Sequence, residues 1–227
     1  MEYLKFPMQY LRISQGENTG SHLGTYAMDL AGRDTGKDPV YAPCSGTVVR
    51  IRSNANGELY LWSDGDVRCP DGYTGPVTVT LIHDETFNVR QGQHVVQGAH
   101  IYDEGGMGHG HPGAYGAHCH MEIVKGHVQP YQTRNAQGSW RTPGQMMHLY
   151  DALWIGGDVA ILGDGGYPWH RLPAAAGRTY TVKAGDGWWR IAAQQLGSGS
   201  LCYKLARANG KTIFSALHPG DVISLEV

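Results

Sequence analysis

Cysteine is scarce in this chain, and its spacing lacks the patterns that mark thiolate metal sites or disulfide scaffolds. Four cysteines are spread over 227 residues and no two form a C-x-x-C pair; they are Cys44, Cys69, Cys119 and Cys202. This spacing argues against a zinc site built from thiolates and against a disulfide scaffold. We expect the cysteines to be reduced and structural.

An excess of charge of one sign and long apolar runs are also missing. Lys and Arg number 18 against 20 Asp and Glu, a formal net charge of -2, so no basic surface suited to nucleic acid is expected. No stretch approaches the ~18 consecutive apolar residues of a membrane span. The first twenty residues contain no apolar run followed by a cleavage site, so we expect a soluble chain made in the cytoplasm without a signal peptide and without membrane insertion.

Glycine, by contrast, is abundant, and it separates short β-branched segments. The chain has 33 Gly, 11 Pro and 41% hydrophobic residues, which predicts a folded, turn-rich body. Alternating segments predict strands at 47–52, 58–62, 77–83 and 118–124, with glycine-rich turns between them. We therefore predict an α+β, mainly β fold, with an antiparallel sheet and long loops; 145–154 is compatible with a short helix.

The chain length suggests one medium domain with a small appended module, at about 150 residues per domain. We place the first domain at 1–160, a linker rich in Gly, Pro and Ala at 161–178, and the module at 179–227. The module reads as strand 179–183, helices 187–196 and 200–209, and strand 221–226, a βααβ pattern. Asp186 is expected to cap the first of these helices, and Gly197 to end it.

Histidine is the residue type that points to chemistry. Two of the twelve histidines, His118 and His120, are two apart in a predicted strand and so face the same side. A catalytic zinc takes about three protein ligands from His and carboxylate side chains. Upstream candidates are His22 and Asp29, and the apolar neighbours of Asp29 predict that its carboxylate is carried inward.

Several further side chains are weighed beside this set. His83 ends a predicted strand, where reactive groups are often presented. Glu122 shares a face with the histidine pair, and either accepts a hydrogen bond from a ligand imidazole or is a solvated charge at a strand end. His109 and His111 form a second pair in a glycine-rich loop and are expected at the rim of the cleft. Asp34 and Asp38 are alternative metal ligands in this upstream region, beside His22 and Asp29.

In this order, the residues resemble the lysostaphin/LytM-type zinc endopeptidases, β-rich enzymes that cut peptide bonds of bacterial peptidoglycan. The resemblance covers about residues 15 to 126, including Pro39–Val48 and His118-Cys-His-Met-Glu122. It implies one zinc ion held by His22, Asp29 and His120, with His83 and His118 as the catalytic histidines. Six residues separate His22 from Asp29, whereas three are commonest in the family.

Residues 179 to 226 resemble a LysM domain, a module that binds glycans containing N-acetylglucosamine. The resemblance rests on Tyr180–Ala193, Leu205–Asn209 and Leu217–Leu225. Trp189 and Ile191 are expected to pack in the module's core. Glycan contacts are expected from the loop residues Gly185, Asp186, Gly187, Ile213 and Phe214.

Together the two resemblances imply a monomeric peptidoglycan hydrolase whose partners are the peptide and glycan of the wall. We expect a phage endolysin that waits in the host cytoplasm and acts on the wall after release. The alternatives are a virion-associated lysin of the same chemistry and an inactive wall-binding protein. Stem-peptide linkages to D-Ala and glycine bridges both remain open as the bond cut.

Overall fold

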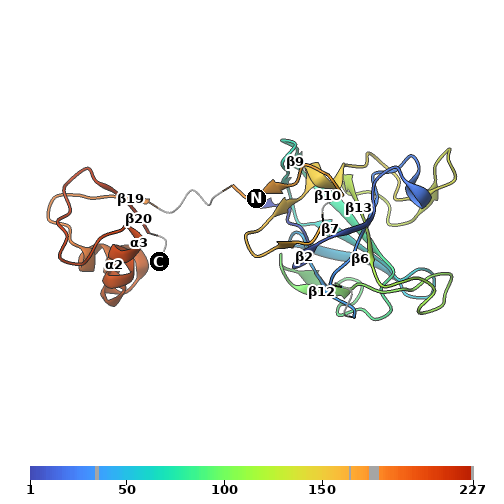
Figure 1. Ribbon diagram of the computed structural model, residues 1–227, viewed down its shortest axis with the longest axis horizontal. Coiled ribbons are helices and arrows are strands. Elements are labelled where there is room, and N and C mark those ends of the chain that lie inside the picture. Colours follow the sequence, from blue (N-terminus) through green and yellow to red (C-terminus); the bar gives the residue numbers. More distant parts are fainter. Residues whose placement is uncertain (34–35, 164, 174–178, 226–227) are drawn as a thin grey trace. The chain divides into compact units, whose positions relative to one another are not determined.

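The computed structural model describes residues 1–33, 36–163, 165–173 and 179–225. The chain divides into two compact units, Met1–Leu172 and Pro173–Val227. Elements of both units are labelled in Figure 1 where there is room.

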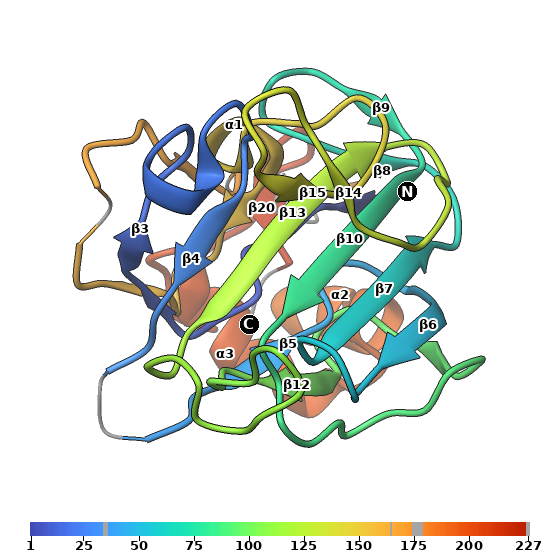
Figure 2. The ribbon, with the colours of Figure 1, turned by 90° about the vertical axis from the view of Figure 1, so that its right-hand side faces the viewer.

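The larger unit is built on a seven-stranded sheet with the strand order β11-β6-β7-β10-β13-β4-β3. Its four longest strands lie side by side across the sheet face seen in Figure 2 and are β6 (Gly46–Arg52), β7 (Glu58–Ser63), β10 (Val77–Ile82) and β13 (Cys119–Lys125). The remaining strands are β3 (Ile13–Gln15), β4 (Met28–Leu30) and β11 (His94–Val95). All pairings within this sheet are antiparallel, as the sequence predicts.

Short pairings surround the sheet. They join β1 (Glu2–Tyr3), β8 (Val67–Arg68) and β9 (Thr74–Gly75); β5 (Pro39–Tyr41) and β12 (His100–Asp103); β14 (Thr133–Arg134) and β15 (Trp140–Arg141); β16 (Trp154–Ile155) and β18 (His170–Arg171); and β2 (Tyr10–Leu11) and β17 (Ala160–Ile161). The helical pieces are the 3₁₀ helix η1 (Gly20–His22) and the single turn α1 (Leu149–Ala152).

The sheet carries the hydrophobic core of this unit. The central strands are buried on both faces: every residue of β10 and all but the last of β13 are buried. Leu59, Leu61, Leu81, Met121 and Ile123 are fully buried in one cluster. Burial on both faces makes the strands rigid, so side chains at their ends are held in fixed directions.

Part of the segment predicted as a linker packs onto the larger unit. The Leu162 N–H donates to the Leu11 carbonyl, β17 pairs with β2, and β18 pairs with β16. The structure thus places the described residues 161–163 and 165–172 in the first unit, because backbone hydrogen bonds hold them there despite the Gly and Pro content. Residues 164 and 174–178 of the predicted linker lie outside the described residues.

The smaller unit has the predicted βααβ order. It comprises β19 (Thr179–Thr181), α2 (Trp188–Leu196), the 3₁₀ helix η2 (Gly199–Leu201), α3 (Cys202–Ala208) and β20 (Val222–Ser224). Gly197 ends α2 in the left-handed conformation with φ 78°, as expected. The cap prediction is wrong: Gly187 is the N-cap, and the Asp186 carboxylate instead accepts from the Tyr180 hydroxyl and the Lys183 N–H.

Helical periodicity also corrects the expectation for Trp189. Trp188, Ile191 and Ala192 lie on the buried face of α2, whereas Trp189 is 66% exposed. A residue one position from Trp188 is turned about a quarter of the way round the helix, away from the core. The mainly β fold class is confirmed. In the described part of the chain, the helices are too short or too polar to cross a bilayer.

Candidate functional site

Three side chains from separate elements bring one donor atom each to a common point. Asp29 on β4 and His120 on β13 are direct partners across antiparallel strands, so both project from the same face. His22 comes from η1. The His120 Nδ1–Asp29 Oδ1 distance is 3.0 Å, His22 Nε2–Asp29 Oδ1 is 3.2 Å and His22 Nε2–His120 Nδ1 is 3.1 Å. Among the described residues, these three form the His/Cys/Asp/Glu group able to hold a metal ion.

The outer ring nitrogens of the two histidines have acceptors of their own. His22 Nδ1 lies 3.2 Å from the Gly16 carbonyl oxygen, and His120 Nε2 lies 3.3 Å from Glu122 Oε1. These oxygens can only accept, so each can hold the hydrogen of the ring nitrogen beside it. The inner nitrogens, His22 Nε2 and His120 Nδ1, face Asp29 Oδ1 and can release their protons when a cation takes the proton's place.

This donor set fits zinc. Nitrogen and oxygen ligands about 2.0–2.1 Å from a tetrahedral ion lie about 3.3 Å apart, close to the three distances here. A carboxylate or carbonyl on the second nitrogen of each histidine is the usual support of a metal-binding imidazole. Two histidines and one carboxylate also leave a fourth position for water or substrate.

The electrostatics of the group favour a positive charge among the donors. Burial raises the pKa of Asp29, but hydrogen bonds from His120 and His22 hold it well below its usual range. Burial likewise lowers the pKa of His120, yet its hydrogen bonds with Asp29 and Glu122 raise it to about 10. Carboxylates lie on both sides of the His120 ring, the partly buried Asp29 and the buried Glu122, and they stabilise a proton on the ring as they would stabilise a bound cation.

Glu122 is fully buried, which excludes the solvated strand-end interpretation. Its Oε1 faces His120, and its Oε2 accepts from the Thr142 N–H at 2.7 Å, the Gln132 amide at 3.2 Å and the Thr142 hydroxyl. Burial raises the pKa of this carboxyl, but the hydrogen bonds from His120 and Thr142 lower it overall. Glu122 therefore remains ionised while it orients His120.

His83 and His118 lie beside the three donors, with ring centroids 4.5 Å apart. His83 follows β10, and its Nδ1–H donates to the Met107 carbonyl at 2.7 Å; His118 precedes β13, and its Nδ1–H donates to the Gly116 carbonyl at 2.7 Å. Both rings thus have a bare Nε2. His118 Nε2 lies 3.8 Å from Asp29 Oδ2. Burial lowers the pKa of His83 to about 4, so this ring is neutral at neutral pH.

The five side chains line a cleft of about 1040 Å³. Its other walls come from the loop after β6, the loop before β13 and the β14–β15 hairpin. Tyr115 is one lining residue that sequence reasoning missed: its ring packs edge-on against His83 with centroids 5.1 Å apart, and its hydroxyl lies 3.0 Å from His109 Nε2. No pattern in the glycine-rich loop marks this tyrosine.

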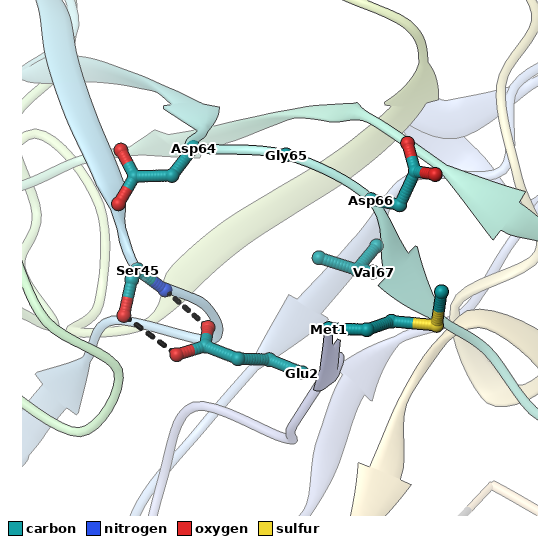
Figure 3. A pocket seen from close by; sticks show the side chains of 7 residues that line it. All are labelled: Met1, Glu2, Ser45, Asp64, Gly65, Asp66 and Val67. Carbon is teal, nitrogen blue, oxygen red and sulfur yellow. Dashed lines mark hydrogen bonds between the residues drawn. The ribbon is translucent and has the colours of Figure 1, made fainter.

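The alternative candidates occupy other places. His109 lies at the cleft wall and His111 is exposed; neither belongs to the three-donor group. Asp38 accepts from the Arg33 N–H at 2.8 Å, and Asp34 lies outside the described residues. A smaller hollow of about 480 Å³ is shown in Figure 3. There the Glu2 carboxylate is occupied by the Ser45 N–H and hydroxyl, and no histidine lines the hollow.

In the smaller unit, a hydrogen bond connects the two loops predicted to contact glycan, 185–187 and 213–214. The Trp188 indole N–H, next to Gly187, donates to the carbonyl of Ser215, next to Phe214, at 2.9 Å. Phe214 is 91% exposed, whereas Ile213 packs partly against the small core. Gly185 adopts φ 83°, and its carbonyl accepts from Arg190.

Comparison with known families identifies this unit. The LysM domain model matches residues 180–225. The LysM prediction is confirmed. The matched residues all lie in the smaller unit.

The chain is also similar to a curated phage protein. Morphogenesis protein 1 of Bacillus phage B103 is 33% identical over 172 residues, which are 74% of this chain and 44% of that protein. The chain thus spans less than half the length of this relative.

Solved structures similar to the chain include peptidases of the kind that the sequence resembles. The catalytic domain of lysostaphin from Staphylococcus simulans is 18% identical and has a TM-score of 0.38, covering 59% of this chain and 89% of that domain. A zinc-containing peptidase from Vibrio cholerae is 20% identical and also has a TM-score of 0.38. The match covers 53% of this chain and 37% of that peptidase.

Proposed function

We propose that the larger unit is a zinc-dependent endopeptidase that hydrolyses peptide bonds of bacterial peptidoglycan. The observation that carries this proposal is the convergence of three donor atoms, from His22, Asp29 and His120, beside two anchored imidazoles in one cleft. All five positions that the family resemblance requires are filled by suitable side chains. This argues against the alternative of an inactive wall-binding protein.

The three ligand side chains would hold the ion, which supplies a Lewis acid that polarises a carbonyl and lowers the pKa of a water molecule. His118 is placed to take a proton, because its Nδ1–H is committed to Gly116 and its bare Nε2 faces the ligand group. A base held in this way then returns the proton to the leaving amine.

His83 is fixed in the same tautomer, with Nδ1–H on the Met107 carbonyl. A neutral ring in this state has a bare Nε2 and no second N–H to offer to an oxyanion. This geometry favours a share in the proton relay with His118 over direct oxyanion stabilisation.

The LysM domain would bring this cleft to the wall by binding its glycan strands. Attachment raises the effective concentration of peptide bonds near the cleft without any new contact at the cleft itself. Gly185, Asp186, Gly187, Ile213 and Phe214 are the proposed contacts, and the exposed ring of Phe214 suits stacking on a sugar face. The proposed site of action is the bacterial wall.

Two biological settings share this chemistry. The phage endolysin expected from the sequence would act from inside the host after release. The similarity to a phage morphogenesis protein favours a second setting, a lysin carried by the virion. Mass spectrometry of purified phage particles separates the two, since only the second places the chain in the particle.

The proposal is tested by metal analysis together with turbidity loss on purified cell walls. We expect one zinc per chain, activity that a chelator abolishes and zinc restores, loss of zinc and activity in His120→Ala, and retained zinc with lost turnover in His118→Ala. His94→Ala, at an exposed histidine paired with Asp64, is the control and keeps both properties. A metal-free wild-type chain with full activity would refute the proposal.

A further inference from the structure

The charged side chains of the cleft differ in how far they are neutralised by their own surroundings. Among the described residues that line it, the acidic ones are Asp29 and Glu58, and the arginines are Arg52 and Arg134. Asp29 belongs to the three-donor group. Glu58 is 1% exposed and lies at the start of β7. Neither carboxylate is therefore free to attract a cationic group on a ligand.

Arg52 is held in the cleft by the buried carboxylate. Its Nη1 lies 3.2 Å from Glu58 Oε1 and 3.1 Å from Glu58 Oε2, and the Tyr60 hydroxyl donates to Glu58 Oε2 at 2.7 Å. The Arg52 side chain is nevertheless 38% exposed. One nitrogen of the guanidinium satisfies Glu58, so its remaining N–H groups are free to act as a preorganised fork for a planar anion.

Arg134 adds a second cation on the β14–β15 hairpin. Its guanidinium lies over the Trp140 ring, 4.7 Å from the centroid, and Trp140 is 53% exposed. Both side chains line the cleft. Stacking occupies the face of a guanidinium and leaves its N–H edge available for a carboxylate.

We propose that the cleft selects peptides carrying a free carboxylate, and that Arg52 and Arg134 are the residues that recognise it. The inference rests on the proposed function and deepens it, because it chooses between the two linkages that the sequence leaves open. A stem peptide with ionised carboxyl groups satisfies both arginines. A glycine bridge has no side chain, and its binding would leave the arginines without an anionic partner.

The substrate side of this inference is tested with the full wild-type chain loaded with zinc. Three substrates are compared by kcat/KM: a cross-linked stem-peptide dimer with free carboxyl groups, the same dimer with those groups amidated, and a pentaglycine peptide whose C-terminus is amidated so that it carries no carboxylate. We expect the free-acid dimer to be preferred by about tenfold or more, the range of a charge-assisted hydrogen bond. Equal hydrolysis of free and amidated dimers, or a preference for pentaglycine, would overturn the inference while the proposed function stands. Hydrolysis of none of the three would refute both.

Variants test the arginines themselves. Arg134→Gln, at an exposed position, should lose about tenfold in kcat/KM on the free-acid dimer and little on the amidated one. Arg52→Gln should lower kcat/KM on the free-acid dimer to a similar degree. Because this variant also removes a partner of the buried Glu58, its folding is checked by circular dichroism, and the test of carboxylate recognition relies on Arg134→Gln. Arg33→Gln is the matched control, since Arg33 also lies 4.7 Å over an aromatic ring, that of Tyr10, and does not line the cleft. Equal losses of Arg134→Gln on both dimers would contradict carboxylate recognition.

Discussion

Replacing Glu122 by Gln tests whether the carboxylate behind His120 sets the zinc affinity. The carboxylate is fully buried and joins the imidazole of His120 to the backbone and side chain of Thr142. Glutamine keeps the shape but replaces one acceptor oxygen by an NH₂ donor. Whichever way the amide is turned, a donor then faces either His120 Nε2–H or the donors of Thr142.

The expected loss has two parts. Removing the support of a ligand histidine costs 10–100-fold in metal affinity, which corresponds to about 1.4–2.7 kcal/mol. An unsatisfied buried donor further costs about 1–3 kcal/mol of folding stability. We therefore expect Glu122→Gln to raise the zinc Kd by one to two orders of magnitude, because the carboxylate no longer orients His120. We also expect a lower Tm for the metal-free chain.

The assay is titration of the metal-free chain with zinc in competition with a chromophoric chelator, and thermal unfolding followed in parallel. Glu104→Gln is the matched control: Glu104 is 1% exposed, accepts the Gly32 N–H at 2.8 Å and is not part of the donor group. It should lower the Tm but leave the zinc Kd unchanged. If Glu122→Gln also left the Kd unchanged, within about twofold, the orienting role of this carboxylate would be refuted.

Three further predictions concern stability and attachment. Gly57→Ala should lower the free energy of unfolding by at least about 2 kcal/mol in a urea titration, because φ is +65° and a Cβ would meet the Asp84 carbonyl oxygen at 1.9 Å. The control Gly72→Ala, where φ is +86° but the space around a Cβ is open, should lower the free energy of unfolding by less. Burial raises the pKa of Asp84 to about 6, so the folded state binds its proton more tightly than the unfolded state, and the free energy of unfolding falls as the pH rises from about 4 to about 6. Asp84→Asn should flatten this dependence by up to about 3 kcal/mol, measured by urea unfolding at several pH values. Leu205→Ala should cost the LysM domain about 2–5 kcal/mol, because Leu205 is fully buried in its small core, and should weaken sedimentation with purified walls while hydrolysis of a soluble peptide is kept.

Much of the fold and the centre of the site follow from local sequence. Alternation of apolar residues located the four long strands to within about a residue at most ends, as expected where burial decides the pattern. The i, i+2 spacing of His118 and His120 placed both at one end of a strand for the same reason. The pairing of His120 with Asp29 is different in kind: they are 91 positions apart in the chain, and the resemblance to a family, not periodicity, indicates that they belong together.

The supports of the site could not be predicted, because each depends on contacts between distant segments. The segment around Thr142 had no functional interpretation from the sequence, yet its N–H and hydroxyl hold Glu122. Arg52 and Glu58 are six residues apart on two neighbouring strands, and only the strand register makes them partners. Trp188 and Trp189 are adjacent and chemically identical, so composition alone does not tell which of them is buried.

The backbone of His83 shows how such distant contacts prepare the site. Its φ of 96° lies where a residue with a Cβ is strained, at a cost of about 1–3 kcal/mol. Hydrogen bonds to two other segments maintain it: the His83 N–H is shared between the Asn56 and Gly57 carbonyls, the His83 carbonyl accepts from the Met107 N–H, and the ring Nδ1–H donates to the Met107 carbonyl. An extended conformation would continue β10 and break these contacts. The strain is thus retained because it turns the imidazole towards His118, so that the orientation of the ring is fixed by the fold before any substrate arrives.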